Sequence, residues 1–185
     1  MNVPLRSRGV DSSISPISVD TVFEVVPLLV TGAAGAVGAY AVALAARDGF
    51  EVVGLAGAQD SEFLLDLGAT ATASQIDEVG TVAAVIDTAG IAAELIDHVD
   101  DGGAVVVVQP DPPRFGRSIT VAHVSVRDRI TDTAGLAELG RLAAEGVLLL
   151  RVAEVIPATG AARAHEKLGE RGTRGRFVLD FTRLN

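Results

Sequence analysis

Residues 28–38 have the sequence LLVTGAAGAVG. Apolar residues at 25–30 predict a strand buried on both faces, and small residues interrupt it at once. The Ala-rich stretch 40–47 then predicts a helix. A strand, a glycine turn and a helix in this order expose backbone N–H groups and the positive end of a helix dipole, which together bind phosphate. The alternative is a turn that only packs a helix closely on a sheet.

The turn departs at one position from the pattern G-x-G-x-x-G of dinucleotide-binding sites. Ala33 stands in the place of the first glycine, and Gly32 precedes it. Gly35 allows the backbone to approach a pyrophosphate, and Gly38 allows the helix to pack closely on the strand. A bound pyrophosphate is therefore expected over residues 34–37. The predicted cofactor contacts of this turn are Gly32, Ala33, Ala34, Gly35, Ala36, Val37 and Gly38.

The composition indicates a folded α/β protein. Of the 185 residues, 49% are hydrophobic and only 4% aromatic, which favours helices packed closely on a parallel sheet. The net charge of −9 argues against a nucleic-acid partner, because a phosphate backbone requires a basic surface. Basic residues near the C-terminus are interspersed with Glu166 and Glu170, which indicates a solvated surface of mixed charge. These basic residues are Arg163, Lys167, Arg171, Arg174 and Arg176.

The residue types also narrow the chemistry. The chain has no cysteine, which excludes disulfides, thiolate nucleophiles and cysteine-bound zinc. Its three histidines, His98, His123 and His165, lack the spacing of metal ligands, so no metal site is expected. No apolar run is long enough to span a bilayer and residues 1–18 lack the core of a signal peptide, so a cytoplasmic protein without membrane contact is expected.

Strands and helices alternate along the chain, which predicts a doubly wound parallel sheet of the Rossmann type, with three α/β/α layers in a single domain at 25–185. Residues 1–24 are expected to form an N-terminal arm, with a short strand at 17–23. Asp60 and Ser61 are expected to cap a helix. Further strands are expected at 51–55, 69–73, 82–86, 104–108, 119–126, 147–156 and 176–181. Further helices are expected at 62–67, 91–99, 131–145 and 158–168.

Several motifs follow one another in a characteristic order. They are VTGAAGAVG at 30–38, FLLDLGA at 63–69, VIDTAG at 85–90, the glycine pair at 102–103, AARAHEKL at 161–168 and RGRFVL at 174–179. Over residues 26–181 this order resembles the medium-chain dehydrogenase/reductase superfamily, and most of all its zinc-independent quinone oxidoreductases and enoyl reductases. The resemblance implies an oxidoreductase that transfers hydride from NAD(P)H to a small-molecule substrate, a quinone or an enone.

The chain departs from this family before its first strand. Family members carry a large GroES-like catalytic domain there, which residues 1–24 do not match. The pocket is therefore expected to be completed by these residues or by a partner chain. One alternative is a non-redox protein on the same scaffold, a cyclase-like or dehydratase-like enzyme that no longer uses a dinucleotide. The other is a ligand-binding or regulatory module.

The second predicted strand bears on the choice of cofactor. An NAD site usually has an acidic residue at the end of this strand, where the present chain has Ala56-Gly57-Ala58-Gln59. Quinone reductases of the resembling family place Ser and Arg or Lys here, on the 2′-phosphate of NADPH; Gln59 and Asp60 are poor substitutes. NADPH is the expected cofactor, with Gly57 and Gln59 as contacts, and NADH or no cofactor as alternatives.

Further candidate contacts follow two other predicted strands. Asp87 and Thr88 end one strand and Val108 and Gln109 end the next, at the edge where open α/β sheets bind ligands. By resemblance these residues would flank the ribose and the nicotinamide. Asp87 is equally suited to capping the following helix. Gln109 can donate a hydrogen bond to a carboxamide or a substrate, or it can simply belong to a turn.

Three residues are candidates for catalysis: His123, Tyr40 and Gln109. His123 can act as a general acid or base if it faces the nicotinamide end, and a structural role is the alternative. Tyr40 lacks the lysine of a Tyr-x-x-x-Lys pair, which indicates packing. In the resembling family the sixth strand often pairs across a two-fold axis, so the alternating segment 119–126 predicts a homodimer.

Overall fold

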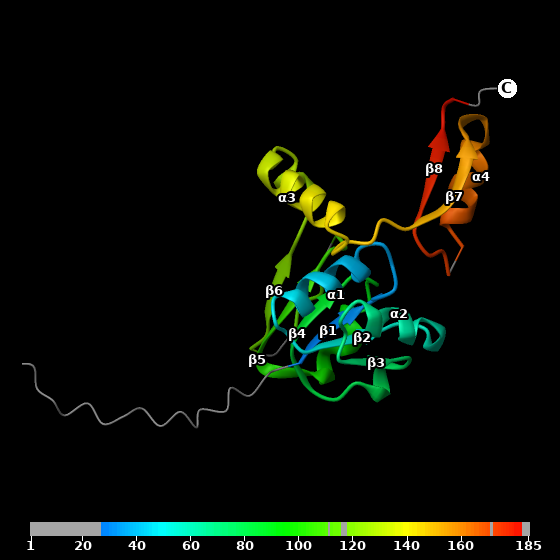
Figure 1. Cartoon of the computed structure of the whole chain (residues 1–185). Coiled ribbons are helices and arrows are strands. Elements are labelled where there is room, and N and C mark those ends of the chain that lie inside the picture. Colours follow the sequence, from blue (N-terminus) through cyan, green and yellow to red (C-terminus); the bar gives the residue numbers. More distant parts are fainter. Residues whose placement is uncertain (1–26, 111, 116–117, 171, 183–185) are drawn as a thin grey trace, which may run out of the picture.

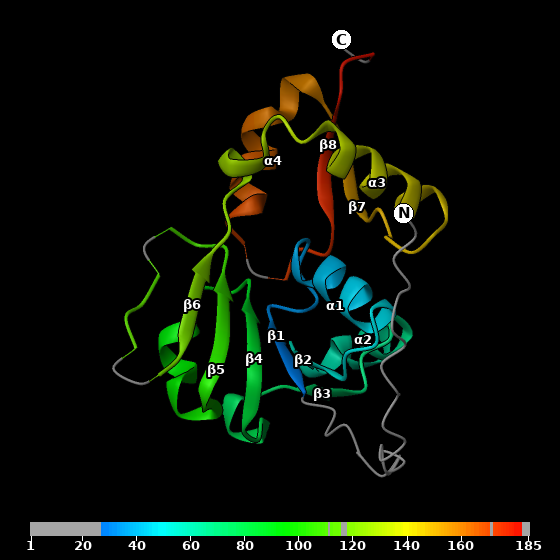
Figure 2. The same ribbon diagram turned by 90° about the vertical axis from the view of Figure 1, so that its left-hand side faces the viewer.

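The computed structural model describes residues 27–110, 112–115, 118–170 and 172–182. Its main body is a six-stranded parallel sheet in the order β3-β2-β1-β4-β5-β6, which confirms the predicted doubly wound sheet (Figures 1 and 2). The predicted arm and the strand at 17–23 lie outside the described residues. The strands are β1 Leu28–Thr31, β2 Val52–Leu55, β3 Ala71–Ala73, β4 Val82–Asp87, β5 Val99–Val107 and β6 Thr120–His123.

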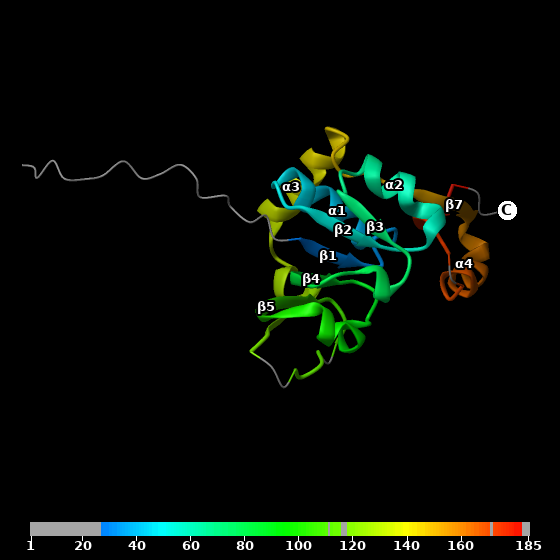
Figure 3. The same cartoon turned by 90° about the horizontal axis from the view of Figure 1, so that it is seen from below.

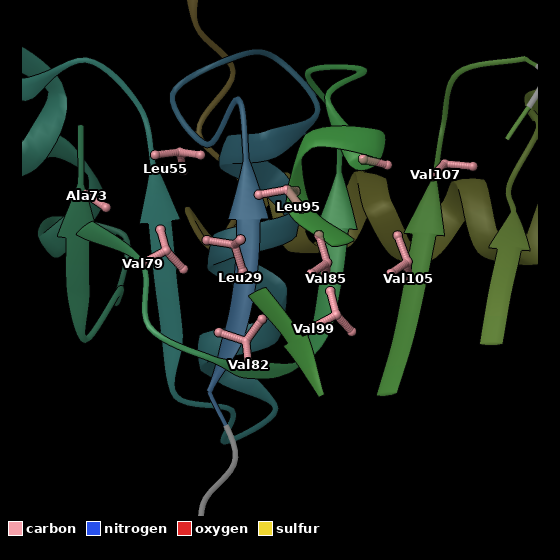
Figure 4. Close-up of a cluster of buried hydrophobic side chains, with 11 residues drawn as sticks. Leu29, Leu55, Ala73, Val79, Val82, Val85, Leu95, Val99, Val105 and Val107 are labelled. Carbon is pink, nitrogen blue, oxygen red and sulfur yellow. The ribbon is translucent and has the colours of Figure 1, made fainter. Parts of the chain in front are cut away.

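The side chains of β1 alternate between two hydrophobic clusters. Leu28 and Val30 pack with α1 (Gly38–Arg47) and α2 (Ser61–Asp66) on one face of the sheet. Leu29 packs on the opposite face with residues of β4 and β5 (Figure 4). Both faces of the central strand are therefore buried, as its continuous apolar sequence predicts. Among the described helices, none combines the length and the apolar composition that a membrane span requires.

Several element boundaries differ from the prediction. The expected helix at 91–99 is the 3₁₀ helix η3 (Ala92–His98), and β5 begins directly after it at Val99 because the chain bends at Gly102 (φ +83°) without leaving the strand. The strand expected at 119–126 ends at His123. The Ser125 side chain accepts a hydrogen bond from the backbone N–H of Arg127, which starts a 3₁₀ turn in place of further strand.

The last two strands do not join the main sheet. β7 (Val152–Pro157) and β8 (Arg176–Asp180) form a separate parallel pair with α4 (Ala161–Leu168), and we call these three elements the C-terminal lobe. Before it, α3 (Thr133–Ala144) packs through Leu142 beside α1 (Figure 3), which carries the chain away from the β6 edge. The strand expected at 147–156 therefore begins only at Val152. Pro157 ends β7, and a 3₁₀ turn (Ala158–Gly160) precedes α4.

An ion-pair cluster joins α4 to β7 within the C-terminal lobe, and its strength depends on pH. The hydrogen bond from Lys167 Nζ (2.5 Å), together with the charges of Arg163 and Lys167, lowers the pKa of the Glu154 carboxylate below its usual value of 4.5. A depressed pKa stabilises the folded form above about pH 4.5, and this contribution is lost as the pH falls through the folded-state pKa. We expect the contact between α4 and β7 to weaken as the pH falls below 4.5. The NMR amide signals of Val155 and Val178 would measure this change.

The Glu154→Gln variant should lose this part of the acid response. Glu166→Gln is the matched control. Glu166 is exposed on α4, the helix that carries Arg163 and Lys167, and has no ion-pair partner among the residues that the structure describes. Identical acid titrations of the wild type and Glu154→Gln would contradict the assignment.

Candidate functional site

The glycine turn at the end of β1 keeps the geometry of a phosphate-binding turn. Gly32 has a φ of +57°, which gives it the conformational role of the first glycine in the pattern. The N–H of Gly35 donates to the carbonyl of Gly32 over 2.8 Å, and α1 begins at Gly38. The side chain of Ala33 is fully buried in the cluster beneath α1 and α2, which explains why alanine fits there. The N-terminal end of α1 therefore follows directly on the turn.

A cleft of about 460 Å³ opens above this turn. One wall consists of residues from the turn, and another of Ala56, Gly57 and Asp60 after β2. Residues 172–174, which connect α4 to β8, and Arg176 of β8 line the opposite side of the cleft. In Figure 2 the C-terminal lobe lies above the carboxyl edge of the main sheet. Its lining residues are Gly32, Ala34, Gly35, Ala36, Val37, Ala56, Gly57, Asp60, Thr88, Gly172, Thr173, Arg174 and Arg176.

Most of the predicted cofactor contacts meet in this cleft. The exceptions nearby are Ala33 and Gly38, which are buried below the surface of the turn. Gln59 folds back over Gly57 and donates to the Asp60 carboxylate over 3.3 Å. The side chain of Gln59 is therefore engaged with its own loop.

Asp87 is buried and occupied by hydrogen bonds from the protein itself. Its carboxylate accepts from the Thr31 hydroxyl (2.5 Å) and from the backbone N–H groups of residues 89–92 (2.8–3.3 Å). The N-cap position of η3 is Ile91, so Asp87 does not cap the helix from that position; its carboxylate instead satisfies the N–H groups of the connecting loop and of the first helical residue, and it ties β4 to β1. Thr88 donates from its hydroxyl to the Thr31 carbonyl (2.6 Å) and lines the cleft.

A second hollow, of about 220 Å³, lies at the ends of β4 and β5. Asp87, Gly90 and Gln109 contribute to its lining, and the Gln109 side chain lies against Gly90. Val108 donates its N–H to the Asp87 carbonyl over 3.4 Å and is not among the lining residues. The structure thus brings Gln109 to the same sheet edge as the glycine turn, one strand beyond Thr88.

The other two catalytic candidates lie elsewhere. Tyr40 packs against the cluster of Ala43, Leu142 and Leu148, as expected of a packing residue. His123 is the exposed last residue of β6, opposite Val107 in the strand register. Neither side chain lines the cleft or the second hollow.

The sequence did not predict that Arg174 and Arg176 line the cleft, or that Arg174 pairs with Asp60. Arg174 binds both carboxylate oxygens of the buried Asp60, with Nε–Oδ1 at 2.6 Å and a second contact from Nη2 to Oδ2. Asp60 occupies the N-cap position of α2, as expected, but its side chain makes no capping hydrogen bond because both oxygens are engaged by Arg174. The predicted solvated surface is wrong for Arg174, which is half-buried against Asp60. Arg176 also lines the cleft but is exposed, and Arg163 and Lys167 form exposed or half-exposed pairs with Glu154. Arg171 lies outside the described residues.

A third arginine contacts the glycine turn directly. Arg151 donates from Nη1 to the Ala34 carbonyl over 3.3 Å, and its guanidinium carbon lies 4.1 Å from the centre of the Phe63 ring. Arg151, Arg174 and Arg176 therefore gather around one turn of a chain whose net charge is −9. Such a local positive charge attracts anionic ligands.

Known proteins share this architecture. The sequence model of a family described as zinc-binding dehydrogenase matches residues 59–179. The quinone oxidoreductase of Coxiella burnetii is 26% identical with a TM-score of 0.72, the match covering 83% of this chain and 52% of that protein. An Escherichia coli quinone oxidoreductase complexed with NADPH is 26% identical with a TM-score of 0.70, covering 84% and 57%. No curated protein sequence gives a significant match.

A metal-bound relative shares the fold alone. It is a thermostable alcohol dehydrogenase of Pyrobaculum aerophilum with bound cobalt and zinc, 23% identical with a TM-score of 0.68, the match covering 83% of this chain and 49% of that protein. This chain thus spans about half the length of the solved structures that it matches. Its described residues contain no group of three or more His, Asp or Glu side chains arranged to hold a metal ion, and cysteine is absent. The donor set therefore does not fit zinc.

Proposed function

This chain belongs to the zinc-binding dehydrogenase family, as a nucleotide-binding domain of the medium-chain dehydrogenase/reductase superfamily, and from this we propose that it binds NAD(P)H for hydride transfer. The substrate class that we propose is a quinone or an enone. We propose that a partner chain, or residues 1–24, completes the substrate pocket.

One observation carries the proposal: the cleft has backbone groups of the glycine turn on one side and arginines on the other. A diphosphate over residues 34–37 would meet the N-terminal end of α1, and its charge would be offset by Arg176 across the cleft. When bound, the cofactor supplies the hydride, so the chain itself has to bind, orient and enclose it.

The second hollow is the natural place for the other half of a dinucleotide. It lies at the ends of β4 and β5, beside the cleft, and Gln109 is the polar side chain at its mouth. We assign Gln109 a hydrogen bond to the carboxamide or to the substrate oxygen. His123 and Tyr40 receive no part in the chemistry, since both lie outside the cleft and the hollow.

Titration with NADPH and NADH, followed by nicotinamide fluorescence, tests the proposal. We expect a saturable change at concentrations below about 1 mM. Ala36→Glu should weaken binding by at least roughly tenfold, because it places a carboxylate in the cleft next to the expected diphosphate. Ala162→Glu, on the exposed surface of α4, is the matched control and should bind as the wild type does. No fluorescence change with the wild type would favour a non-redox protein on this scaffold.

We also propose that two copies of the chain pair through β6. This strand is the last in the sheet order, so no described strand covers its outer edge, and exposed apolar residues follow it at Val124, Val126 and Ile130. Unpaired edges of this kind readily pair with another strand. Sedimentation should show a dimer of the wild type, and a monomer of Val121→Pro, which removes a backbone donor from the outer edge because the alternate residues of β6 bond to β5. A wild type that remains monomeric at high concentration would contradict the pairing.

A further inference from the structure

We infer that Arg174 recognises the 2′-phosphate of NADPH and so gives this site its preference for NADPH over NADH; the inference rests on the proposed dinucleotide site. The second strand carries no basic residue near its end, so the recognition group has to come from elsewhere in the chain. Arg174 reaches this place from the C-terminal lobe, 114 residues away from Asp60 in sequence.

The position of Arg174 matches the adenosine end of a dinucleotide. In doubly wound folds the ribose of the adenosine lies beyond the end of the second strand, while the pyrophosphate lies over the glycine turn. Gly57 and Asp60 follow β2 and line the cleft together with Arg174. A ribose placed there would carry its 2′-substituent toward the guanidinium.

The contact with Asp60 fixes the guanidinium and leaves donors available. The pair engages Nε and Nη2 of Arg174, which uses two of the five N–H donors of the group. The Asp60 side chain is 8% exposed and the Arg174 side chain 29%, so the carboxylate is enclosed while part of the arginine faces the cleft. The three remaining donors suit a phosphate oxygen, which accepts strong hydrogen bonds from guanidinium groups.

The same pair disfavours NADH. In NAD sites an acidic residue accepts hydrogen bonds from the ribose hydroxyls. Here both oxygens of Asp60 already accept from Arg174, and Gln59 donates to one of them as well. Asp60 is therefore not available to the ribose.

Arg176 keeps this end of the cleft positive. Asp60 offsets the charge of Arg174, but Arg176 lines the same cleft and has no ion-pair partner among the residues described by the structure. The charges of Arg174 and Asp60 cancel, so the charge of Arg176 leaves this end of the cleft with a net positive charge. A dianionic phosphate would meet an attractive field even with the Asp60 carboxylate nearby.

Calorimetric titration of the full chain with NADPH and with NADH tests the inference. We expect the wild type to bind NADPH roughly 10 to 100 times more tightly than NADH, as is typical when hydrogen bonds to a charged group are gained. Arg174→Gln should bind both cofactors equally, with its affinity for NADH unchanged. The unchanged NADH affinity shows that the cleft is intact.

Two further variants separate recognition from folding. Arg163→Gln removes an arginine of the same lobe that pairs with Glu154 outside the cleft, and it should keep the wild-type preference. Asp60→Asn combined with Arg174→Gln removes both charges, so no buried carboxylate is left unpaired, and it should lose the preference as Arg174→Gln does. Retention of the wild-type preference in both Arg174 variants would overturn the inference.

The outcomes also distinguish this inference from the proposed function. A wild type that binds NADPH and NADH equally would overturn the role of Arg174 and leave the dinucleotide site standing. A wild type that binds neither cofactor would remove the dinucleotide site, and the role of Arg174 with it.

Discussion

Replacing Asp87 with alanine should lower the free energy of unfolding by about 4 kcal/mol, a large part of the stability of an ordinary domain. Asp87 is 1% exposed, and its carboxylate accepts from the Thr31 hydroxyl and from the N–H groups of residues 89–92. Alanine would leave these donors without a partner where water does not reach them readily, at a cost of about 1–3 kcal/mol for each buried one. Urea unfolding followed by circular dichroism measures the loss.

Asp132→Ala is the control for this substitution. Asp132 also accepts a backbone N–H at the start of a helix, but it does so through a single bond to Gly135 (2.8 Å) and remains partly exposed. Loss of such a cap costs about 1 kcal/mol. Equal losses for the two variants would show that the buried network around Asp87 adds nothing beyond an ordinary helix cap.

Gly38→Ala should destabilise the protein by about 3 kcal/mol and abolish binding of a dinucleotide. A Cβ at position 38 would lie 2.3 Å from the Gly32 carbonyl oxygen and 2.8 Å from Ala33 Cα, both of which belong to the backbone of the turn. The helix would have to move away from the strand, since no side chain is there to rotate aside. Thermal unfolding and the fluorescence titration measure the two effects.

Gly140→Ala gives the opposite expectation with the same chemical change. Gly140 lies inside α3, and no atom comes within 4 Å of a Cβ built there. Alanine should stabilise the protein by about 0.5–1 kcal/mol through its higher helix propensity. If Gly38→Ala were tolerated as well as Gly140→Ala, the close packing of α1 on the turn would not matter for folding.

The doubly wound sheet could be predicted because its signals are local. Apolar runs ending in glycine or Asp mark the strands around the turn, and each is followed within a few residues by a helix or a 3₁₀ turn. The position of the turn between β1 and α1 was predictable, but its backbone details were not. Ala33 occupies a glycine position of the pattern because Gly32 supplies the positive φ and the methyl group of Ala33 fills the core.

The C-terminal lobe could not be predicted in the same way. The sequence of an apolar strand such as β7 does not tell which sheet the strand will join. Its separation from the main sheet depends on the direction that the chain takes after α3. The pairing of Asp60 with Arg174 likewise joins two residues 114 positions apart. Each residue has a simpler local explanation, a helix cap for Asp60 and a solvated charge for Arg174, and only the three-dimensional contact rules these out.

For Asp87 the sequence left a cap and a ligand contact as equal alternatives, and its carboxylate instead satisfies the N–H groups of the connecting loop and of the first helical residue. Positions at strand ends were predictable as neighbours of the site, because parallel strands finish at one edge. The direction of each side chain was not, since it depends on which backbone donors lie within reach.

The floor of the cleft consists largely of glycine and alanine, so an anion lying there would face the peptide units of the turn. A surface of this kind has no functional group that a point substitution can delete, because every residue type except proline brings the same amide. Binding there can be lost by rerouting the chain, as a Cβ at position 38 would do, or by a side chain that brings negative charge into the cleft, as in Ala36→Glu. Apart from these two cases, the ability of this turn to bind an anion depends little on which side chains surround it.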